Sequence, residues 1–281
     1  GMCSPPESRS RKTDQDSKQH RNHPFAPRFR VTMKILCTND DGYLTTGIRT
    51  LASAARSLGD VTIVAPDREQ SATSHSLTLH NPLRSRRAPD GAWIVDGTPT
   101  DCVILAVNEL LHSRPDVCVS GVNHGPNMGE DVLYSGTVAA AMEATVIGIP
   151  AVALSYTGDR YEELEGWEPL IGQLLQRLLD RRTFPDHTLF NVNLPGISPN
   201  DVAGIKVTSL GRRRYADSIT RALDPSGKEY FWIGGGVANW TGTDDSDFQA
   251  VRDGFVSVTP LHLDLTNYQL LEEIRGWDLA L

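Results

Sequence analysis

The chain has 281 residues, 39% of them hydrophobic and 22% charged, and a formal net charge of −8. These values are typical of a soluble globular protein with one large domain. Residues 1–32 carry seven Lys or Arg against three Asp or Glu, a net charge of +4, which leaves −12 for the remainder. Such an acidic body argues against nucleic acid as the main partner, because phosphate backbones are bound by positive charge.

The first 32 residues are polar and basic, contain several prolines and have no apolar run. We expect a disordered extension there, and neither a secretion signal nor a membrane anchor. The four cysteines show no C-x-x-C spacing, so we expect reduced thiols in a cytoplasmic protein. They are Cys3, Cys37, Cys102 and Cys118.

From Met33 onward, short apolar runs alternate with segments of helical periodicity. Strands are predicted at 34–39, 60–67, 92–97, 115–121, 149–155 and 188–195. Helices are predicted at 48–58, 98–112, 138–148 and 167–182. Strands that alternate with helices and lack polar alternation indicate a mostly parallel sheet covered on both faces. We therefore predict an α/β, Rossmann-like doubly wound domain over residues 33–210.

Two adjacent carboxylates, Asp40 and Asp41, follow the first predicted strand and precede Gly42. Consecutive side chains of a strand point to opposite faces, so both carboxylates serve one site only if the chain has already turned. Gly42 favours such a turn. Two carboxylates without a neighbouring base suit a hard cation with oxygen ligands. A solvated Asp-Gly turn is the alternative interpretation of this pair.

The loop after the second strand, "REQSATSHSLT", combines hydroxyl side chains with a histidine. Its hydroxyls, Ser71 among them, suit a metal shell or phosphate oxygens, although a polar surface loop has the same composition. His75 is a candidate general acid, as is His124 further along the chain.

A glycine-rich stretch, "SGVNHGPNMGEDVLYSGTVAAAMEA", spans residues 120–144. Its glycines allow close approach of the backbone to a ligand, and Asn123 and Asn127 offer amide groups. Ser135, Gly136 and Thr137 then open a helix, whose free N–H groups and dipole favour an anion. Ser135 also fits an ordinary N-cap. The stretch is not a P-loop, because no Gly-Lys-Ser/Thr follows, and it has no G-x-G-x-x-G spacing.

These features all fall at the carboxyl ends of predicted parallel strands, where doubly wound sheets carry their sites. A hard metal beside an anion-binding helix N-terminus suits phosphoryl transfer to water. The metal neutralises phosphate charge and activates water, and the helix stabilises the developing negative charge.

After Leu210 the pattern changes. Residues 212–235 hold two potential strands around the turn signal "DPSG", with aromatic and charged residues intermixed. We predict a long hairpin arm that packs on a partner subunit or on its own domain. A last strand at 255–260 and a C-terminal segment complete a third region, residues 211–281.

These motifs together resemble the SurE family of stationary-phase survival proteins. The matching stretches include "ILCTNDDGYLTTGI", "VAPDREQSATSHSLT", "DGTPTDCV", "IPAVALS", "NVNLP", "VSVTPLHLDLT" and the glycine-rich stretch, in family order from Met33 to about Thr266. The basic extension lies outside the family pattern. So do Ala139 and Ala144, where glycine is expected at one or both positions.

The resemblance implies a metal-dependent 5′/3′-nucleotidase that hydrolyses nucleoside monophosphates with one divalent cation, Mn²⁺ or Mg²⁺, per subunit. The implied metal ligands are Asp40, Asp41, Ser71 and Asn123, and the two aspartates are also the implied catalytic residues. Phosphate contacts are implied for Asn127, Ser135, Gly136 and Thr137. The resemblance further implies homodimers or homotetramers formed through the hairpin arm and the C-terminal segment.

Two other functions compete with this one. An aspartyl-phosphate phosphatase would need Asp-x-Asp after the first strand, whereas the aspartates here are adjacent. A non-catalytic nucleotide sensor or assembly protein would account for the long arm. Base preference, 5′ against 3′ preference, polyphosphatase activity and the native metal are not readable from the sequence.

Overall fold

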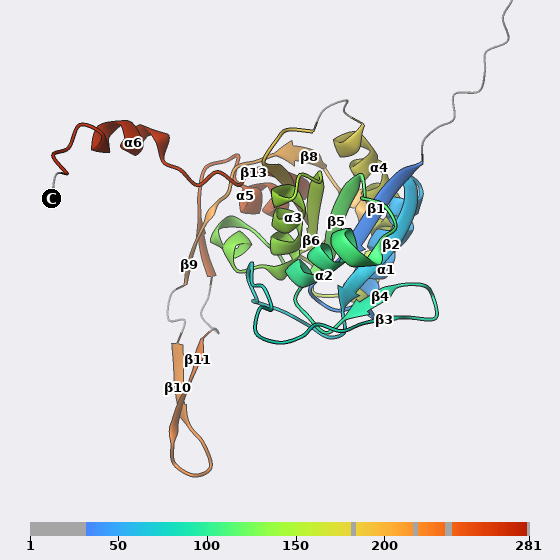
Figure 1. Ribbon diagram of the computed structural model, residues 1–281. Coiled ribbons are helices and arrows are strands. Elements are labelled where there is room, and N and C mark those ends of the chain that lie inside the picture. The colour runs from blue at the N-terminus through green and yellow to red at the C-terminus, as the bar shows by residue number, and fades with distance from the viewer. Residues whose placement is uncertain (1–31, 181–183, 216–218, 234–237, 280–281) are drawn as a thin grey trace, which may run out of the picture. The chain divides into compact units, whose positions relative to one another are not determined.

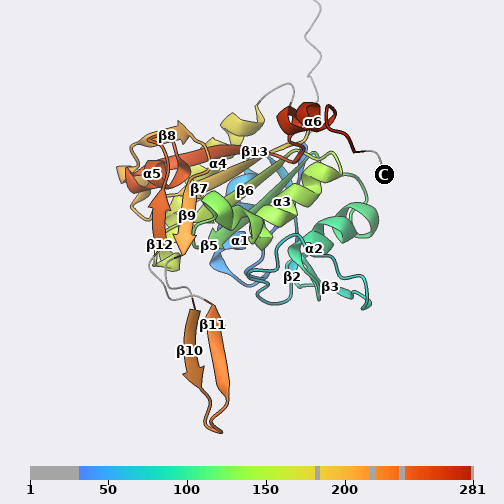
Figure 2. The same ribbon diagram turned by 90° about the vertical axis from the view of Figure 1, so that its left-hand side faces the viewer.

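The computed structural model describes residues 32–180, 184–215, 219–233 and 238–279 (Figures 1 and 2). The chain separates into two units, Gly1–Val31 and Thr32–Leu281, and the second unit holds all described residues. The predicted disordered extension lies outside the described residues, apart from Thr32. Within the described ranges we find no helix with the length and hydropathy needed for a membrane span.

A nine-stranded sheet runs through the second unit in the order β3-β4-β2-β1-β5-β6-β7-β13-β8. Its strands, in chain order, are β1 (Met33–Thr38), β2 (Gly59–Pro66), β3 (Ser85–Arg87), β4 (Trp93–Val95), β5 (Val117–His124), β6 (Ala151–Tyr156), β7 (Thr188–Leu194), β8 (Gly204–Val207) and β13 (Phe255–His262). The strands from β4 to β7 are parallel. The edge strand β3 is antiparallel to β4, and β13 is antiparallel to β7. The predicted mostly parallel sheet is confirmed.

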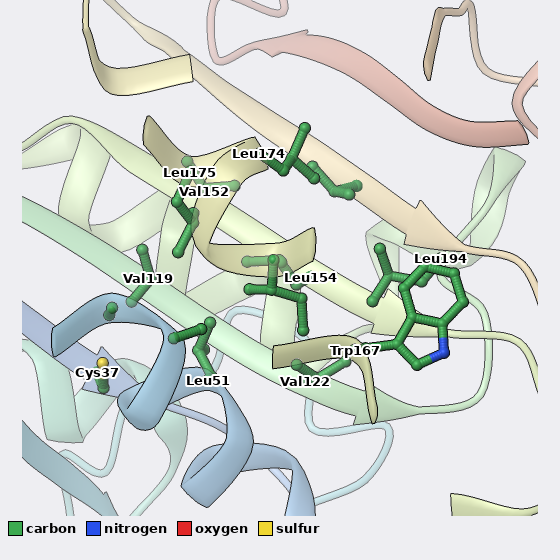
Figure 3. Packing of buried hydrophobic residues seen from close by; sticks show 14 of the residues in the cluster. Cys37, Leu51, Val119, Val122, Val152, Leu154, Trp167, Leu174, Leu175 and Leu194 are labelled. Carbon is green, nitrogen blue, oxygen red and sulfur yellow. The ribbon is translucent and has the colours of Figure 1, made fainter. Parts of the chain in front are cut away.

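Helices cover both faces of this sheet. Four of them are α1 (Thr46–Arg56), α2 (Pro99–Leu105), α3 (Gly136–Val146) and α4 (Glu168–Leu179). Figures 1 and 2 show α2 and α3 side by side over one face. On the other face, Leu51 of α1 and Leu174 of α4 join the buried sheet residues Val152 and Leu154 in one apolar cluster (Figure 3).

Local sequence explains where these helices begin. Thr98 and Asp101 form a capping box at the start of α2, with Pro99 in its first turn. Ser135 caps α3, whose alanine-rich sequence favours helix and packs closely. The remaining helical segments are η1 (Ala106–Leu110), η2 (Gly129–Leu133), η3 (Tyr161–Trp167), η4 (Pro199–Asp201), α5 (Asp247–Arg252) and α6 (Tyr268–Ile274).

The predicted hairpin consists of two antiparallel pairs. Strand β9 (Arg212–Tyr215) pairs with β12 (Ala238–Thr241), and β10 (Ile219–Leu223) pairs with β11 (Glu229–Ile233). The turn between β10 and β11 forms because the Asp224 carboxylate accepts hydrogen bonds from Ser226 and Lys228. These two pairs form separate two-stranded sheets, whereas β8 and β13, which precede and follow the hairpin along the chain, belong to the nine-stranded sheet.

The order of the strands places a topological switch point between β1 and β5. From β1 the chain moves outward to β2 on one side, and later returns to form β5 on the other side. Doubly wound sheets bind ligands at such a point, beyond the carboxyl ends of the strands. The segments that follow Thr38 and Ser120 therefore meet at the same place.

Candidate active site

A turn at the end of β1 brings both aspartates to the switch point. Asn39 is buried and donates its amide to the Gly42 carbonyl (2.9 Å) and the Thr45 hydroxyl (3.1 Å). Gly42 has φ of +99°, a conformation that favours glycine. The strand alternation is thus broken at the point where the sequence predicted a turn, and Asp40 and Asp41 can serve one site.

Asp40 is the most deeply buried acidic group of the site, with 3% of its surface exposed. Its carboxylate accepts a hydrogen bond from the Thr137 hydroxyl at the start of α3. The pKa of Asp40 is raised to about 6, because burial disfavours the charged form and outweighs the Thr137 hydrogen bond. Gly136 lies against it: a Cβ at that position would be 2.8 Å from the Asp40 Cβ.

Asp41 is half-buried and accepts hydrogen bonds from the His124 N–H (3.2 Å) and the Tyr161 hydroxyl (3.3 Å). Its pKa is also raised, chiefly by burial. Among the described residues, neither Asp40 nor Asp41 forms an ion pair with Lys or Arg. Two neighbouring carboxylates are therefore withdrawn from water without a cationic side chain to compensate them, which is unfavourable unless a cation binds.

Asn123 reaches the aspartates through an irregularity in β5. The pairing with β6 shifts between Ser120 and Asn123, as in a β-bulge, and such a shift re-aims the side chains that follow. The Asn123 amide donates to the Gly125 carbonyl at 2.8 Å. Its carbonyl oxygen then lies 3.5 Å from the Thr137 hydroxyl that binds Asp40. Strand β5 was predicted to end at Gly121, within this irregularity, and it runs on to His124.

A buried amide network holds the glycine-rich loop at Asn127. The Asn193 side chain accepts from the Asn127 N–H (2.9 Å) and donates to its carbonyl (3.0 Å), so one amide pairs with both groups of one residue. Asn191 donates to the same carbonyl at 2.8 Å. The Asn127 side chain donates to the Ser155 hydroxyl at 2.8 Å. The loop is thus fixed to β6 and β7 by buried hydrogen bonds.

Ser135, Gly136 and Thr137 occupy the N-terminus of α3, as predicted. The Ser135 hydroxyl accepts from the Val138 N–H at 3.1 Å and is therefore an N-cap. Thr137 is fully buried, and its hydroxyl donates to Asp40. Thr137 therefore faces Asp40, and only Ser135 of these three residues lines the pocket described next.

A pocket of about 650 Å³ opens over this arrangement. It brings together five of the eight residues that were named as metal ligands or phosphate contacts: Asp40, Ser71, Asn123, Asn127 and Ser135. Its other lining residues are Ala72, His124, Pro126, Asp131, Tyr134 and Ile233. Asp41 adjoins it through the His124 backbone, whereas Gly136 and Thr137 lie behind Asp40.

The donor atoms at this pocket fit a hard divalent cation. No group of three or more His, Cys, Asp and Glu side chains in the described ranges is close enough to hold a metal. The site supplies two carboxylates, the Asn123 amide oxygen and the exposed Ser71 hydroxyl, which donates to Glu69 at 2.6 Å. Such an all-oxygen set is suited to Mg²⁺ or Mn²⁺ and poorly suited to a metal that prefers nitrogen or sulfur.

The two histidines considered as general acids have different surroundings. His75 lies 2.7 Å from the Glu143 carboxylate on α3 and does not line the pocket. His124 lines the pocket and stacks on Tyr161 with 4.5 Å between ring centroids. Sequence reasoning missed Tyr161, which lies in η3, 120 residues from Asp41 along the chain. No motif marks that residue, so only the fold reveals its contact with the site.

Comparison with known proteins places this geometry in a family. The family model described as "Survival protein SurE" matches residues 35–217. A 5′-nucleotidase SurE of Gemmatimonas aurantiaca is 56% identical over 87% of this chain and 98% of its own length. The 5′-nucleotidase SurE of Geobacter metallireducens is 50% identical over 88% of this chain and 98% of its own.

A solved structure supports the same conclusion. The crystal structure of SurE protein from Aquifex aeolicus superposes with a TM-score of 0.77 at 42% identity, covering 86% of this chain and 98% of the other. The family resemblance seen in the sequence is confirmed: the chain belongs to the SurE family.

Proposed function

We propose that this protein is a metal-dependent nucleotidase that hydrolyses nucleoside 5′- and 3′-monophosphates to nucleoside and phosphate. The nucleotidase activity is supported by relatives that are named 5′-nucleotidase SurE and cover most of the chain. The observation in the site that carries the proposal is the pair of aspartates, withdrawn from water without a Lys or Arg partner in the described ranges and adjoining a pocket beside a helix N-terminus.

The proposed metal ligands are Asp40, Asp41, Ser71 and Asn123, for one divalent cation, Mg²⁺ or Mn²⁺. When bound, the cation supplies charge neutralisation at the phosphate and a water of lowered pKa. Asp40 is held for this role by Thr137, and Asp41 by the His124 N–H. One of the two carboxylates also orients the attacking water, because both lie at the switch point where the substrate phosphorus must approach.

The phosphate group is proposed to lie against the N-terminus of α3 and the Asn127 loop. The Ser135 hydroxyl accepts from the Val138 N–H and keeps its own O–H group as a donor. Ser135 and Asn127 line the pocket, so the phosphate contacts are proposed for these two residues. Such an N-terminus favours the negative charge that develops on the phosphoryl oxygens.

The hairpin supports a proposal about assembly. The exposed apolar residues of β10 and β11 suit contact with a second copy, so we propose a homodimer or homotetramer formed through the hairpin.

The cysteines support a proposal about the location of the protein in the cell. The described cysteines, Cys37, Cys102 and Cys118, are free and buried, which suits a reducing, cytoplasmic location. Cell fractionation followed by immunoblotting with an antibody against this chain tests the location directly.

Phosphate release from a panel of nucleoside 5′- and 3′-monophosphates tests the proposed activity. We expect turnover with Mn²⁺ or Mg²⁺, none with EDTA, and loss of at least about 100-fold in kcat for Asp40→Asn and Asp41→Asn. Turnover of both variants close to that of the unaltered protein would end the proposal. Nucleotide binding without turnover by the unaltered protein would instead favour a sensor.

A further inference from the structure

The pocket has an apolar side that the reaction at the phosphate does not use. The proposed metal ligands and phosphate contacts occupy its polar end, whereas Ala72, Pro126, Tyr134 and Ile233 provide apolar lining. A volume of about 650 Å³ lies within the range of pockets that enclose a whole small organic ligand. A phosphate group with one cation fills only a part of such a pocket, so the rest is available to the group that the phosphate esterifies.

Tyr134 is the aromatic residue best placed on this side. Its N–H donates to the Asp131 carbonyl (3.0 Å), and its carbonyl accepts from the Ser74 N–H (3.1 Å). The backbone is thus held between η2 and the loop that carries Ser71. The side chain is nevertheless 60% exposed, although it lines the pocket. An aromatic ring that is carried by a fixed backbone and remains open to solvent is available for stacking on a ligand at little cost in conformational entropy.

The position of Tyr134 in the chain relates it to the phosphate end. The next residue is Ser135, the N-cap of α3, and the Ser135 side chain lines the same pocket. A ligand with an anionic group at this N-terminus and a flat ring beyond it would meet both features at once. Nucleoside monophosphates have this arrangement, with the sugar between phosphate and base.

We propose that Tyr134 is the base-binding residue of the pocket and stacks on the nucleobase of the substrate. This inference rests on the proposed nucleotidase function and specifies its substrate class. Stacking uses the π-face that every nucleobase has, so this contact does not require one particular base. Purine nucleotides, which have the larger ring system, are favoured over pyrimidine nucleotides.

The test compares kcat/KM for AMP with kcat/KM for ribose 5-phosphate, which has the same sugar and phosphate but no base. Replacement Tyr134→Ala is expected to lower kcat/KM for AMP about 5- to 100-fold, mainly through KM, since stacking on an aromatic side chain is lost. Activity on ribose 5-phosphate is expected to stay within about twofold, because its contacts are unchanged. Tyr134→Phe keeps the ring and retains the preference for AMP.

Two further variants distinguish aromatic stacking by Tyr134 from the effect of apolar volume and from the effect of removing an exposed side chain. Tyr134→Leu keeps apolar volume without a planar ring, so it is expected to lose most of the AMP preference. Leu133→Ala is the matched control, because Leu133 is the neighbouring residue and is 59% exposed but does not line the pocket. This variant is expected to keep the preference of the unaltered protein for AMP over ribose 5-phosphate. An unchanged ratio of AMP to ribose 5-phosphate activity in both Tyr134→Ala and Tyr134→Leu overturns the inference alone. Failure of the unaltered protein to hydrolyse AMP overturns the proposed function and this inference with it.

Discussion

Thr137 links the proposed metal site to the helix behind it. The family resemblance implied a phosphate contact for Thr137, and the structure shows this residue buried with its hydroxyl on Asp40. This role was not predictable, because spacing along the chain does not reveal which face of a helix start a side chain occupies. We infer that Thr137 orients the Asp40 carboxylate for its ligand.

Replacement Thr137→Val removes the hydroxyl and keeps the shape of the side chain. We expect Mn²⁺ affinity to fall about 10- to 100-fold, the usual loss when a group that orients a metal ligand is removed. Isothermal titration calorimetry on EDTA-treated protein measures this affinity. Thr137→Ser restores the hydroxyl and should bind Mn²⁺ almost as the unaltered protein does. Equal affinity of the Val and Ser variants would show that the hydroxyl does not orient the ligand.

At the scale of elements, the site depends on segments that no motif joins. The residues after β1 and those after β5 were predicted to meet, because parallel strands place their carboxyl ends along one edge. The bulge in β5, and η3 with Tyr161, were not predicted. Bulges depend on cross-strand register, and a short 3-10 segment has no strong periodicity, so local sequence carries little signal for either.

The amide network beneath the Asn127 loop yields a graded prediction. Asn193 makes two hydrogen bonds to the backbone of Asn127, and Asn191 makes one. Since a buried group left unpaired costs about 1–3 kcal/mol, Asn193→Ala is expected to lower the free energy of unfolding by about 2–4 kcal/mol. Asn191→Ala is expected to cost about 1–2 kcal/mol, because the Asn127 carbonyl keeps one donor.

Urea unfolding followed by circular dichroism ranks these variants. The replaced side chains are similar in size and lie on the same strand, so each serves as the other's control. Equal losses for the two variants, or a larger loss for Asn191→Ala, would mean that general packing of β7 dominates over pairing with the loop.

In the molecule as a whole, the outer pair of the hairpin, β10 and β11, differs from β9, whose Arg213 is hydrogen-bonded to Glu130 and Asp131 of η2. The prediction of an antiparallel pair around Asp224 is confirmed, yet its apolar side chains remain exposed, with Trp232 at 65%. Local turn chemistry made the hairpin predictable, whereas no local pattern indicates what its exposed apolar side chains contact. Isolated two-stranded hairpins are marginally stable in water, which favours contact with another copy of the chain.

The size of the protein in solution tests this contact. Light scattering after gel filtration is expected to show a dimer or tetramer. The double replacement Phe231→Asp with Trp232→Asp should shift the mass towards the monomer, because charges disfavour burial of that strand. Lys228→Gln, in the turn of the same hairpin, is the matched control and should leave the mass unchanged. If the unaltered protein is a monomer, the proposed contact between copies through the hairpin is refuted.

Asp40 and Asp41 are proposed to compensate their burial by binding one divalent cation that hydrolysis requires. Stepwise addition of Mn²⁺ to EDTA-treated protein, with bound metal and AMP hydrolysis followed in the same samples, tests this proposal. Activity is expected to rise from zero in proportion to metal occupancy and to saturate at one ion per chain. Full activity in metal-free protein, or activity that does not follow occupancy, would contradict it.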